Sequence, residues 1–245
     1  MKLRRPIYLN SAVAALSSVV LAAAMLSANA APAARKAPAK KTPAKAATRA
    51  PMVPLKLALP KPAYLGTPKN ITGTTAERPT GKPRPAVYVP AGSRNVAFKK
   101  PVTGSDDAPI IGTLDLITDG DKQAVEGSWV EFGPGTQWVQ IDLQQPYTLS
   151  YLVLWHFHGE ARVYRDVVVQ VADDRDFIKG VRTVFNNDRD NSSGQGLGKD
   201  REFYESAEGK LINMKGVKAR YVRLYSKGNT SDDQNHYTEV EVYGR

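Results

Sequence analysis

The sequence contains no cysteine. Disulfides, thiolate nucleophiles and cysteine-ligated zinc are therefore excluded, and so is a lipid anchor attached to a cysteine. A domain without disulfides relies on its hydrophobic core, and a stretch of about 150 residues is long enough to build one.

Acidic residues are nearly missing from the first part of the chain. Only Glu77 of the 24 Asp and Glu precedes Asn95, whereas 16 of the 34 Lys and Arg do. The formal charge is therefore +15 before Asn95 and −5 from Asn95 onward, within a total of +10. Because the basic character belongs to the N-terminal part, it does not indicate a domain that binds nucleic acid specifically.

Long hydrophobic runs are also rare, and the one that stands out is Ala12–Leu26. Basic residues precede it, and Ala28-Asn29-Ala30 follows it with small residues suited to cleavage after Ala30. This pattern predicts a secretory signal peptide over residues 1–30. A retained membrane anchor is the alternative, but the run is shorter than the ~20 residues that span a bilayer. We expect a secreted or periplasmic protein with no transmembrane segment after signal cleavage.

Residues 31–94 are predicted to be a disordered linker. Ala31–Ala50 contains only Ala, Pro, Lys, Arg and Thr, with six basic residues, and further prolines recur up to Pro90. Such a composition favours a solvated, extended chain, with partial order expected near Ala86–Pro90. The basic stretch is interpreted as a spacer, and adhesion to an anionic surface is the alternative.

From Asn95 to Arg245 the dominant pattern has a period of two residues. In Trp138–Leu143, the apolar residues Val139, Ile141 and Leu143 share one face. The same alternation, or a run that is apolar on both faces, occurs at Tyr151–His156, Val163–Val171, Arg220–Tyr225 and Thr238–Tyr243. Turn residues such as Gln145-Pro146 and Gly216 separate these runs. The pattern predicts an all-β domain, an antiparallel sandwich or barrel.

Several short segments, taken in order, resemble the discoidin domain, also called the coagulation-factor C-type domain. They are Asn95-Val96-Ala97, Lys100–Thr103, Thr118–Asp121, Trp138–Leu143, Arg220–Leu224 and Glu239–Gly244. The resemblance implies a jelly-roll β-sandwich of the galactose-binding-like type, over residues 95–245. Members of this family bind carbohydrates, membrane lipids or proteins through loops at one end, and bacterial members often serve as carbohydrate-binding modules.

The resemblance also implies a structural calcium ion between the Asp-Gly loop and the start of the last strand. By position the ligands would be Asp119, Asp121 and Glu239, with Glu126 in place of a threonine that the family usually has. Calcium takes six to eight oxygen ligands, and Asp-Gly supplies a carboxylate in a tight turn. The alternative is an ordinary Asp-Gly turn beside a solvated glutamate.

Two segments at strand ends carry side chains suited to a sugar. Sugar sites need planar hydrogen-bonding groups together with an aromatic ring. The candidate ligand-binding residues are His156, His158, Arg162, Tyr164, Asn235, His236 and Tyr237. Trp129 and Phe132 are further rings that such a site would use. Ordinary loop polarity is the alternative, and a zinc site made by the three histidines is a less favoured one.

The loop Asp188–Gly194 is rich in oxygen ligands, but its glycine falls one place late for a calcium-binding EF-hand loop, and Lys199 stands where the glutamate belongs. We interpret it as a polar loop. Enzyme motifs such as Gly-x-Ser-x-Gly and His-Glu-x-x-His do not occur. The sequence therefore predicts an exported, non-catalytic module that binds carbohydrate or a cell-envelope polymer. The alternative is an adhesion module for protein or lipid, and a hydrolase that uses a histidine-bound metal is a third hypothesis.

Overall fold

The computed structural model describes residues 50–64, 71–76, 79 and 81–245. The predicted signal peptide and the basic stretch that follows it up to Arg49 lie outside the described residues. Within the described residues, no helix is long and apolar enough to cross a membrane.

The regular secondary structure of the described chain consists almost wholly of strands. In order these are β1 (Met52–Pro54), β2 (Tyr88–Pro90), β3 (Arg94–Asn95), β4 (Val102–Gly104), β5 (Val130–Phe132), β6 (Gln137–Trp155), β7 (Val168–Ala172), β8 (Arg182–Asn186), β9 (Lys210–Ser226), β10 (Asn235–Tyr237) and β11 (Glu239–Gly244). One 3-10 helix, η1 (Leu114–Thr118), lies between β4 and β5. The predicted all-β class is confirmed.

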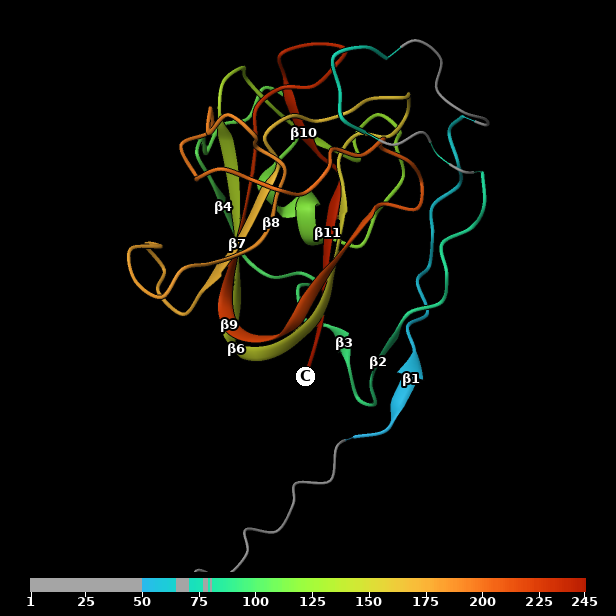
Figure 1. The fold of residues 1–245 in the computed structure, drawn as a ribbon, viewed down its shortest axis with the longest axis vertical. Helices are drawn as coiled ribbons and strands as arrows, with labels where there is room; N and C mark the ends of the chain where they lie inside the picture. The colour runs from blue at the N-terminus through green and yellow to red at the C-terminus, as the bar shows by residue number, and fades with distance from the viewer. Residues whose placement is uncertain (1–49, 65–70, 77–78, 80) are drawn as a thin grey trace, which may run out of the picture. The chain divides into compact units, whose positions relative to one another are not determined.

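Every pairing between these strands is antiparallel. The main sheet has the order β3-β11-β6-β9-β7-β8, with β4 also paired to β6, and β5 pairs separately with β10. In Figure 1 the long strands β6 and β9 curve together around one end of the domain, so that they contribute to both layers of the sandwich. Most connecting loops gather at the opposite end, which we call the loop end.

Two predicted turns lie inside these long strands rather than between strands. Gln145-Pro146 falls where the pairing of β6 with β9 breaks between Asp142 and Tyr147. Gly216, with φ of 70°, lies within β9. The turn residues therefore mark the bend of a continuous pair of strands, because a local break in register lets a strand change layer without ending.

The core consists of the side chains that the alternating pattern assigns to one face. Val139, Ile141 and Leu143 of β6 are fully buried, as are Val240 and Val242 of β11. The run Leu152–Trp155 is buried on both faces, as predicted for a central strand. Burial of so many branched and aromatic side chains supplies the stabilisation that a chain without disulfides needs.

The residues before Pro90 also contact the sandwich. We call the described residues of 50–90 the N-terminal arm. β1 and β2 pair with each other, Met52 opposite Pro90 and Pro54 opposite Tyr88. Further along the arm, Thr74 Oγ1 donates a hydrogen bond to Glu202 Oε2 at 2.7 Å, and Arg84 Nη2 donates to the carbonyl oxygen of Glu208 at 2.7 Å. The order expected near Ala86–Pro90 is present. The prediction of a disordered linker is wrong for residues 50–64 and 71–76, because strand pairing and hydrogen bonds to the sandwich hold these segments.

Candidate functional site

The two predicted ligand-binding segments come together at the loop end. The rings of His156 and Tyr164 are stacked, with centroids 4.2 Å apart, and Tyr237 lies 5.0 Å from His156. The Tyr164 hydroxyl lies 2.9 Å from Nδ1 of His236. These four side chains are almost completely buried, so they form a polar layer beneath the surface rather than the surface itself.

Two of the predicted residues use their polar atoms within the fold. Asn235 accepts hydrogen bonds from Ser226 Oγ and the Gly228 N–H, and its Nδ2 donates to the carbonyl oxygens of Gly133 and Gly135. A buried amide must be satisfied in this way, and these four bonds tie three loops together. The Tyr237 hydroxyl is likewise paired with Ser226 Oγ at 3.0 Å.

His156 and His158 are also fully buried. His156 Nδ1 lies 2.6 Å from Oε1 of Glu205, whose side chain is equally buried. His158 Nε2 lies 2.9 Å from the carbonyl oxygen of Lys122. The three histidines do not converge on one point, and the one cluster of three possible metal ligands found in the described part of the chain contains no histidine. This arrangement does not favour a zinc site.

Above the buried layer, Arg162 lies between aromatic rings and carboxylates. Its guanidinium is 4.9 Å from the centroid of the Phe157 ring, and Phe157 packs edge-on against Trp129 at 4.8 Å. Arg162 Nε donates to Glu160 at 2.8 Å, and Nη1 donates to Asp232 at 2.9 Å. Trp129 and Phe157 are half-buried, so part of each ring faces solvent. This surface combines rings with planar hydrogen-bonding groups.

A chain of hydrogen bonds links the buried layer to this surface. Burial and the charge of Arg162 lower the pKa of His236 to about 4, so its ring is neutral at pH 7. Nε2 lies 3.2 Å from a carboxylate oxygen of Glu131, which can only accept, so Nε2 carries the proton. Nδ1 is then the acceptor for the Tyr164 hydroxyl. The direction of donation runs from Tyr164 through His236 to Glu131.

Carboxylates outnumber cations on this surface. Burial and the charge of Asp232 raise the pKa of Glu131, and Arg162 opposes them. Glu131 comes from β5, and its backbone pairs with that of His236 on β10. The short β5–β10 pair therefore fixes both side chains at the loop end. We call Trp129, Glu131, Phe157 and Arg162 the surface cluster, and His236 of the buried layer lies beneath it.

The predicted calcium ligands divide into two groups. Glu239, at the start of β11, is fully buried, and its Oε2 accepts a hydrogen bond from the Gly120 N–H at 3.1 Å. Its Oε1 has no hydrogen-bond partner among the described residues. Burial raises the pKa of Glu239 to about 9, and the nearby carboxylate of Asp119 is one of the charges that raise it further. A buried carboxylate with a free oxygen next to a second carboxylate fits a cation.

The other two predicted ligands lie in the exposed part of the same loop. Asp121 accepts hydrogen bonds from the Gln123 N–H at 2.9 Å and from Ser128 Oγ at 2.8 Å. Glu126 is exposed two residues before Ser128. The structure therefore brings Asp119 and Glu239 together, whereas Asp121 braces the loop.

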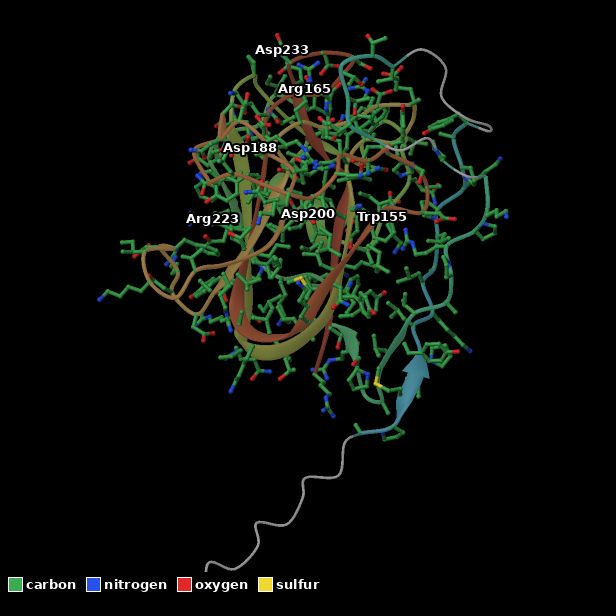
Figure 2. The ribbon with its side chains drawn as sticks, in the orientation of Figure 1. Trp155, Arg165, Asp188, Asp200, Arg223 and Asp233 are labelled. Atoms are coloured by element: carbon green, nitrogen blue, oxygen red, sulfur yellow. The ribbon has the colours of Figure 1, made fainter. Side chains whose placement is uncertain are left out.

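The polar loop after β8 gathers a separate acidic group. Carboxylate oxygens of Asp166, Asp188 and Asp190 lie within 4.8 Å of one another. Asp188 is buried, and it accepts hydrogen bonds from the backbone N–H groups of Ser192 and Ser193 at 3.1 and 2.9 Å. In Figure 2 Asp188 lies toward the loop end, where Arg165 and Asp233 also lie, whereas Trp155, the last residue of β6, lies lower in this view.

Sequence reasoning missed Phe157, Glu131, Glu160 and Asp232. Phe157 stands between two predicted residues, His156 and His158. Only the alternation of side chains between opposite faces of the chain after β6 distinguishes Phe157 from these two neighbours. The other three are acidic residues in loops or on a short strand, and no local pattern separates them from solvated ones. Their contacts with Arg162 and His236 join residues 2 to 105 positions apart in the sequence.

Comparisons with solved structures find similar folds at low identity. The CBM32 of AlyQ, solved with 4,5-unsaturated mannuronic acid, has 20% identity and a TM-score of 0.44 over 59% of this chain and 95% of its own. A fucose-binding module from Streptococcus pneumoniae has 19% identity and a TM-score of 0.44, over 62% and 98%. In a family 89 glycoside hydrolase from Clostridium perfringens, at 19% identity and a TM-score of 0.46, the match covers 62% of this chain but 14% of the enzyme.

No curated protein matches this sequence. The family model named F5/8 type C domain matches residues 101–240, which is more than half of the chain. The match includes β4 to β10 and the surface cluster. With the antiparallel sandwich described above, it confirms the resemblance read from the strands. The chain therefore belongs to the F5/8 type C, or discoidin, domain family.

Proposed function

We propose that the domain is a non-catalytic module that binds carbohydrate through the surface cluster. The observation that carries the proposal is the arrangement around Arg162, where two half-exposed rings, Trp129 and Phe157, adjoin fixed hydrogen-bonding groups. A sugar presents an apolar face and a rim of hydroxyl groups, which match a ring surrounded by planar donors and acceptors.

In this mechanism each residue has a separate role. A half-exposed ring of Trp129 or Phe157 packs against the apolar face of the sugar. Glu131 accepts from a hydroxyl while His236 holds it in place. The predicted residues beneath the surface support the cluster, because their buried hydrogen bonds fix the loops in advance. They are His156, His158, Tyr164, Asn235, His236 and Tyr237.

We further propose that calcium stabilises this end of the sandwich. Glu239 and Asp119 would hold the ion, with Asp121 and Glu126 as the additional predicted ligands. The free oxygen of the buried Glu239 carboxylate supports the site. A bound calcium ion would supply positive charge to this carboxylate and tie β11 to the loop after η1.

Export and envelope association complete the proposal. The signal-peptide pattern of residues 1–30 supports a periplasmic or secreted location, and the partner would then be a glycan or polymer of the cell envelope. The basic stretch would add attraction to an anionic surface.

A second function, adhesion to protein or lipid, is supported by a different observation. Ile110 is 60% exposed and Ile111 is 40% exposed, and the backbone of both is hydrogen-bonded to Glu131. Large apolar side chains held at the loop end suit an apolar partner surface.

A glycan array of the full mature chain, with calcium and with chelator, tests the first proposal. We expect specific binding that falls by about tenfold or more in Arg162→Gln, because the guanidinium packs on the Phe157 ring and fixes Glu160 and Asp232 around it. Asp115→Asn, an exposed change on η1 away from the cluster, is the matched control.

Binding to no glycan by a folded protein would overturn the carbohydrate proposal. Binding to a protein or lipid surface that is lost in Ile110→Ser, and kept in Arg162→Gln, would establish the second function instead.

A further inference from the structure

The N-terminal arm lies outside the residues that match the family model, yet hydrogen bonds attach it to the domain at three places. All three attachments fall on residues 202–209, which we call the bridging stretch. They run from the Tyr64 hydroxyl to the carbonyl oxygen of Glu205, from Thr74 Oγ1 and the Thr75 N–H to the carboxylate of Glu202, and from Arg84 Nη2 to the carbonyl oxygens of Glu208 and Gly209.

The bridging stretch has no strand ladder of its own. All of its residues are described, and none of them lies in a strand, because the stretch belongs to the connection between β8 and β9. It is held to the sandwich by the contacts of Glu205 and by Trp155 Nε1, which donates to the carbonyl oxygen of Ala207 at 3.1 Å. Irregular segments open more readily than paired strands, so the bonds from the arm contribute to holding this stretch in place.

Glu205 is the residue at which the arm and the sandwich meet. Its carbonyl oxygen accepts from the Tyr64 hydroxyl, and its own N–H donates to the carbonyl oxygen of Arg162 at 2.9 Å. Its Oε1 lies 2.6 Å from Nδ1 of His156, and both of these side chains are fully buried. Partners from three separate parts of the chain therefore fix the position of one residue.

Both partners of Glu205 within the sandwich lead to the surface cluster. Arg162 is a member of the cluster. His156 stacks on Tyr164, which begins the hydrogen-bonded chain that ends at Glu131. A displacement of Glu205 would therefore reach two members of the cluster, because closely packed side chains and hydrogen-bonded networks transmit such shifts.

Tyr64 is well suited to hold Glu205 from the side of the arm. Its side chain is half-buried. Burial and the charge of Glu205 raise the pKa of Tyr64 to about 12, so the hydroxyl keeps its proton at pH 7. A carbonyl oxygen only accepts, so the hydroxyl must be the donor. Loss of this hydroxyl would take a hydrogen bond from the Glu205 carbonyl oxygen, and a polar group that loses its partner is costly.

We propose that Tyr64 is a positioning residue for the surface cluster, which it fixes through Glu205, and that the N-terminal arm is therefore part of the binding unit. This inference rests on the proposed carbohydrate-binding function of the cluster. In this role the arm does not touch the sugar. It holds Arg162 and the buried layer in place before the sugar arrives, so less ordering is needed on binding and the affinity is higher.

Isothermal titration calorimetry of the full mature chain tests this role with the variant Tyr64→Phe, which removes only the hydroxyl. The probes are galactose, glucose, mannose, fucose and N-acetylglucosamine, each titrated separately. We expect the Kd of a probe that binds the parent protein to rise about fivefold or more in Tyr64→Phe. Tyr88→Phe is the matched control, because Tyr88 lies in the same arm and is 53% exposed, and its Kd should equal that of the parent.

Nitrogen-15 NMR without sugar gives a readout that a general loosening of the arm would not produce. Tyr64→Phe should shift the resonances of the Glu205 amide, of Arg162 Nε–H and of the His156 ring nitrogens. Thr74→Val removes a hydrogen bond from another attachment, at Glu202, and should leave these resonances and the Kd unchanged.

The outcomes separate this inference from the carbohydrate proposal. Equal Kd values for the parent protein and Tyr64→Phe would overturn the inference and leave the carbohydrate proposal standing. An equal loss of affinity in Thr74→Val would also overturn it, because Tyr64 would then have no specific role. If the folded parent binds no probe, the carbohydrate proposal loses support, and the Arg162 Nε–H resonance decides the inference. A shift in Tyr64→Phe supports the positioning of Arg162 by the arm, and an unchanged resonance overturns it.

Discussion

At the scale of single residues, His236 makes stability depend on pH. Its pKa is about 4 in the folded protein, against an ordinary value of 6.5. Between these values the unfolded state binds the proton and the folded state does not, so stability is full above pH 6.5 and falls as the pH drops toward 4. The loss reaches up to about 3 kcal/mol. Urea unfolding midpoints at several pH values between 7.5 and 4 measure it.

His236→Gln isolates this contribution, because glutamine cannot titrate. Carboxylates also titrate in acid, so the informative quantity is the difference in slope between the parent protein and the variant. We expect the variant to lose less stability over this pH range. Equal slopes for the two proteins would show that His236 is not held neutral by the fold.

Gly209 is a second residue whose environment makes a quantitative prediction. It adopts φ of 63°, and a Cβ placed there would lie 2.6 Å from the Trp155 ring. Gly209→Ala is expected to cost roughly 3 kcal/mol, since backbone strain and overpacking add. Gly180, with φ of 66° and open space around it, is the matched control, and Gly180→Ala is expected to cost only about 1 kcal/mol. Equal unfolding free energies for the two variants would contradict the close contact.

Part of the site could be predicted from the residues alone, and part could not. Arg162 and His236 stand out because a polar, planar side chain at a strand end is uncommon enough to notice. The burial of each residue could not be predicted, because Tyr164 and Asn235 lie in segments that look like loops in the sequence, just as Arg162 does. Whether such a residue faces solvent or the buried layer depends on contacts with strands far away in the chain.

At the scale of elements, the start of β11 and the loop after η1 are expected to respond to calcium together. If Glu239 and Asp119 bind the ion, calcium at a hundredfold excess over its Kd adds about 2.7 kcal/mol. For a domain of this size that raises the Tm by about 5–10 °C relative to chelator. Differential scanning calorimetry with calcium and with EDTA measures the shift.

Glu239→Gln should abolish the shift without unfolding the protein, because a buried amide resembles the protonated carboxyl in size. Glu126→Gln tests whether the exposed predicted ligand takes part, and Asp115→Asn serves as an unrelated acidic control. A calcium-dependent Tm that persists in Glu239→Gln would show that the ion does not bind at Glu239.

The strands were predicted where alternation was strong, as at Trp138–Leu143, because a half-buried sheet imposes a period of two. The continuity of β6 and β9 was not predicted, because Gln145-Pro146 has the composition of a turn. A register break and a true turn use the same residue types. Only the pairing of Tyr147 with Ala219 on the same partner strand shows that β6 continues.

At the scale of the whole molecule, the N-terminal arm is expected to contribute to stability. Arg84 donates to two backbone carbonyl oxygens and pairs with Glu208. Arg84→Gln should lower the free energy of unfolding by about 1–2 kcal/mol, since bonds to charged groups are the stronger ones. Hydrogen exchange of the amides in 202–209 should become faster. Lys56→Gln, an exposed change in the same arm, should alter neither the free energy of unfolding nor the exchange rates. Unchanged exchange rates in Arg84→Gln would show that the attachment does not stabilise residues 202–209.

The uneven distribution of charge leads to a prediction for the basic stretch. The chain carries +15 before Asn95 and −5 after it, so attraction to an anionic surface would come from the first part and not from the sandwich. Replacing the basic residues Arg35, Lys36, Lys40, Lys41, Lys45 and Arg49 with Gln should weaken sedimentation with anionic lipid vesicles by more than about tenfold, because each charge near such a surface contributes about 1 kcal/mol.

The dependence of binding on salt concentration distinguishes this electrostatic attraction from sugar binding. Exposed charges are screened over about 8 Å at physiological ionic strength, so vesicle binding should weaken as salt rises from 0.05 to 0.5 M, roughly a threefold shortening of that length. Sugar binding at the surface cluster relies on stacking and on fixed hydrogen bonds, so it should change little over the same range. Vesicle binding that survives both high salt and the replacement of all six residues would instead point to the exposed Ile110 and Ile111, and therefore to lipid or protein adhesion at the loop end.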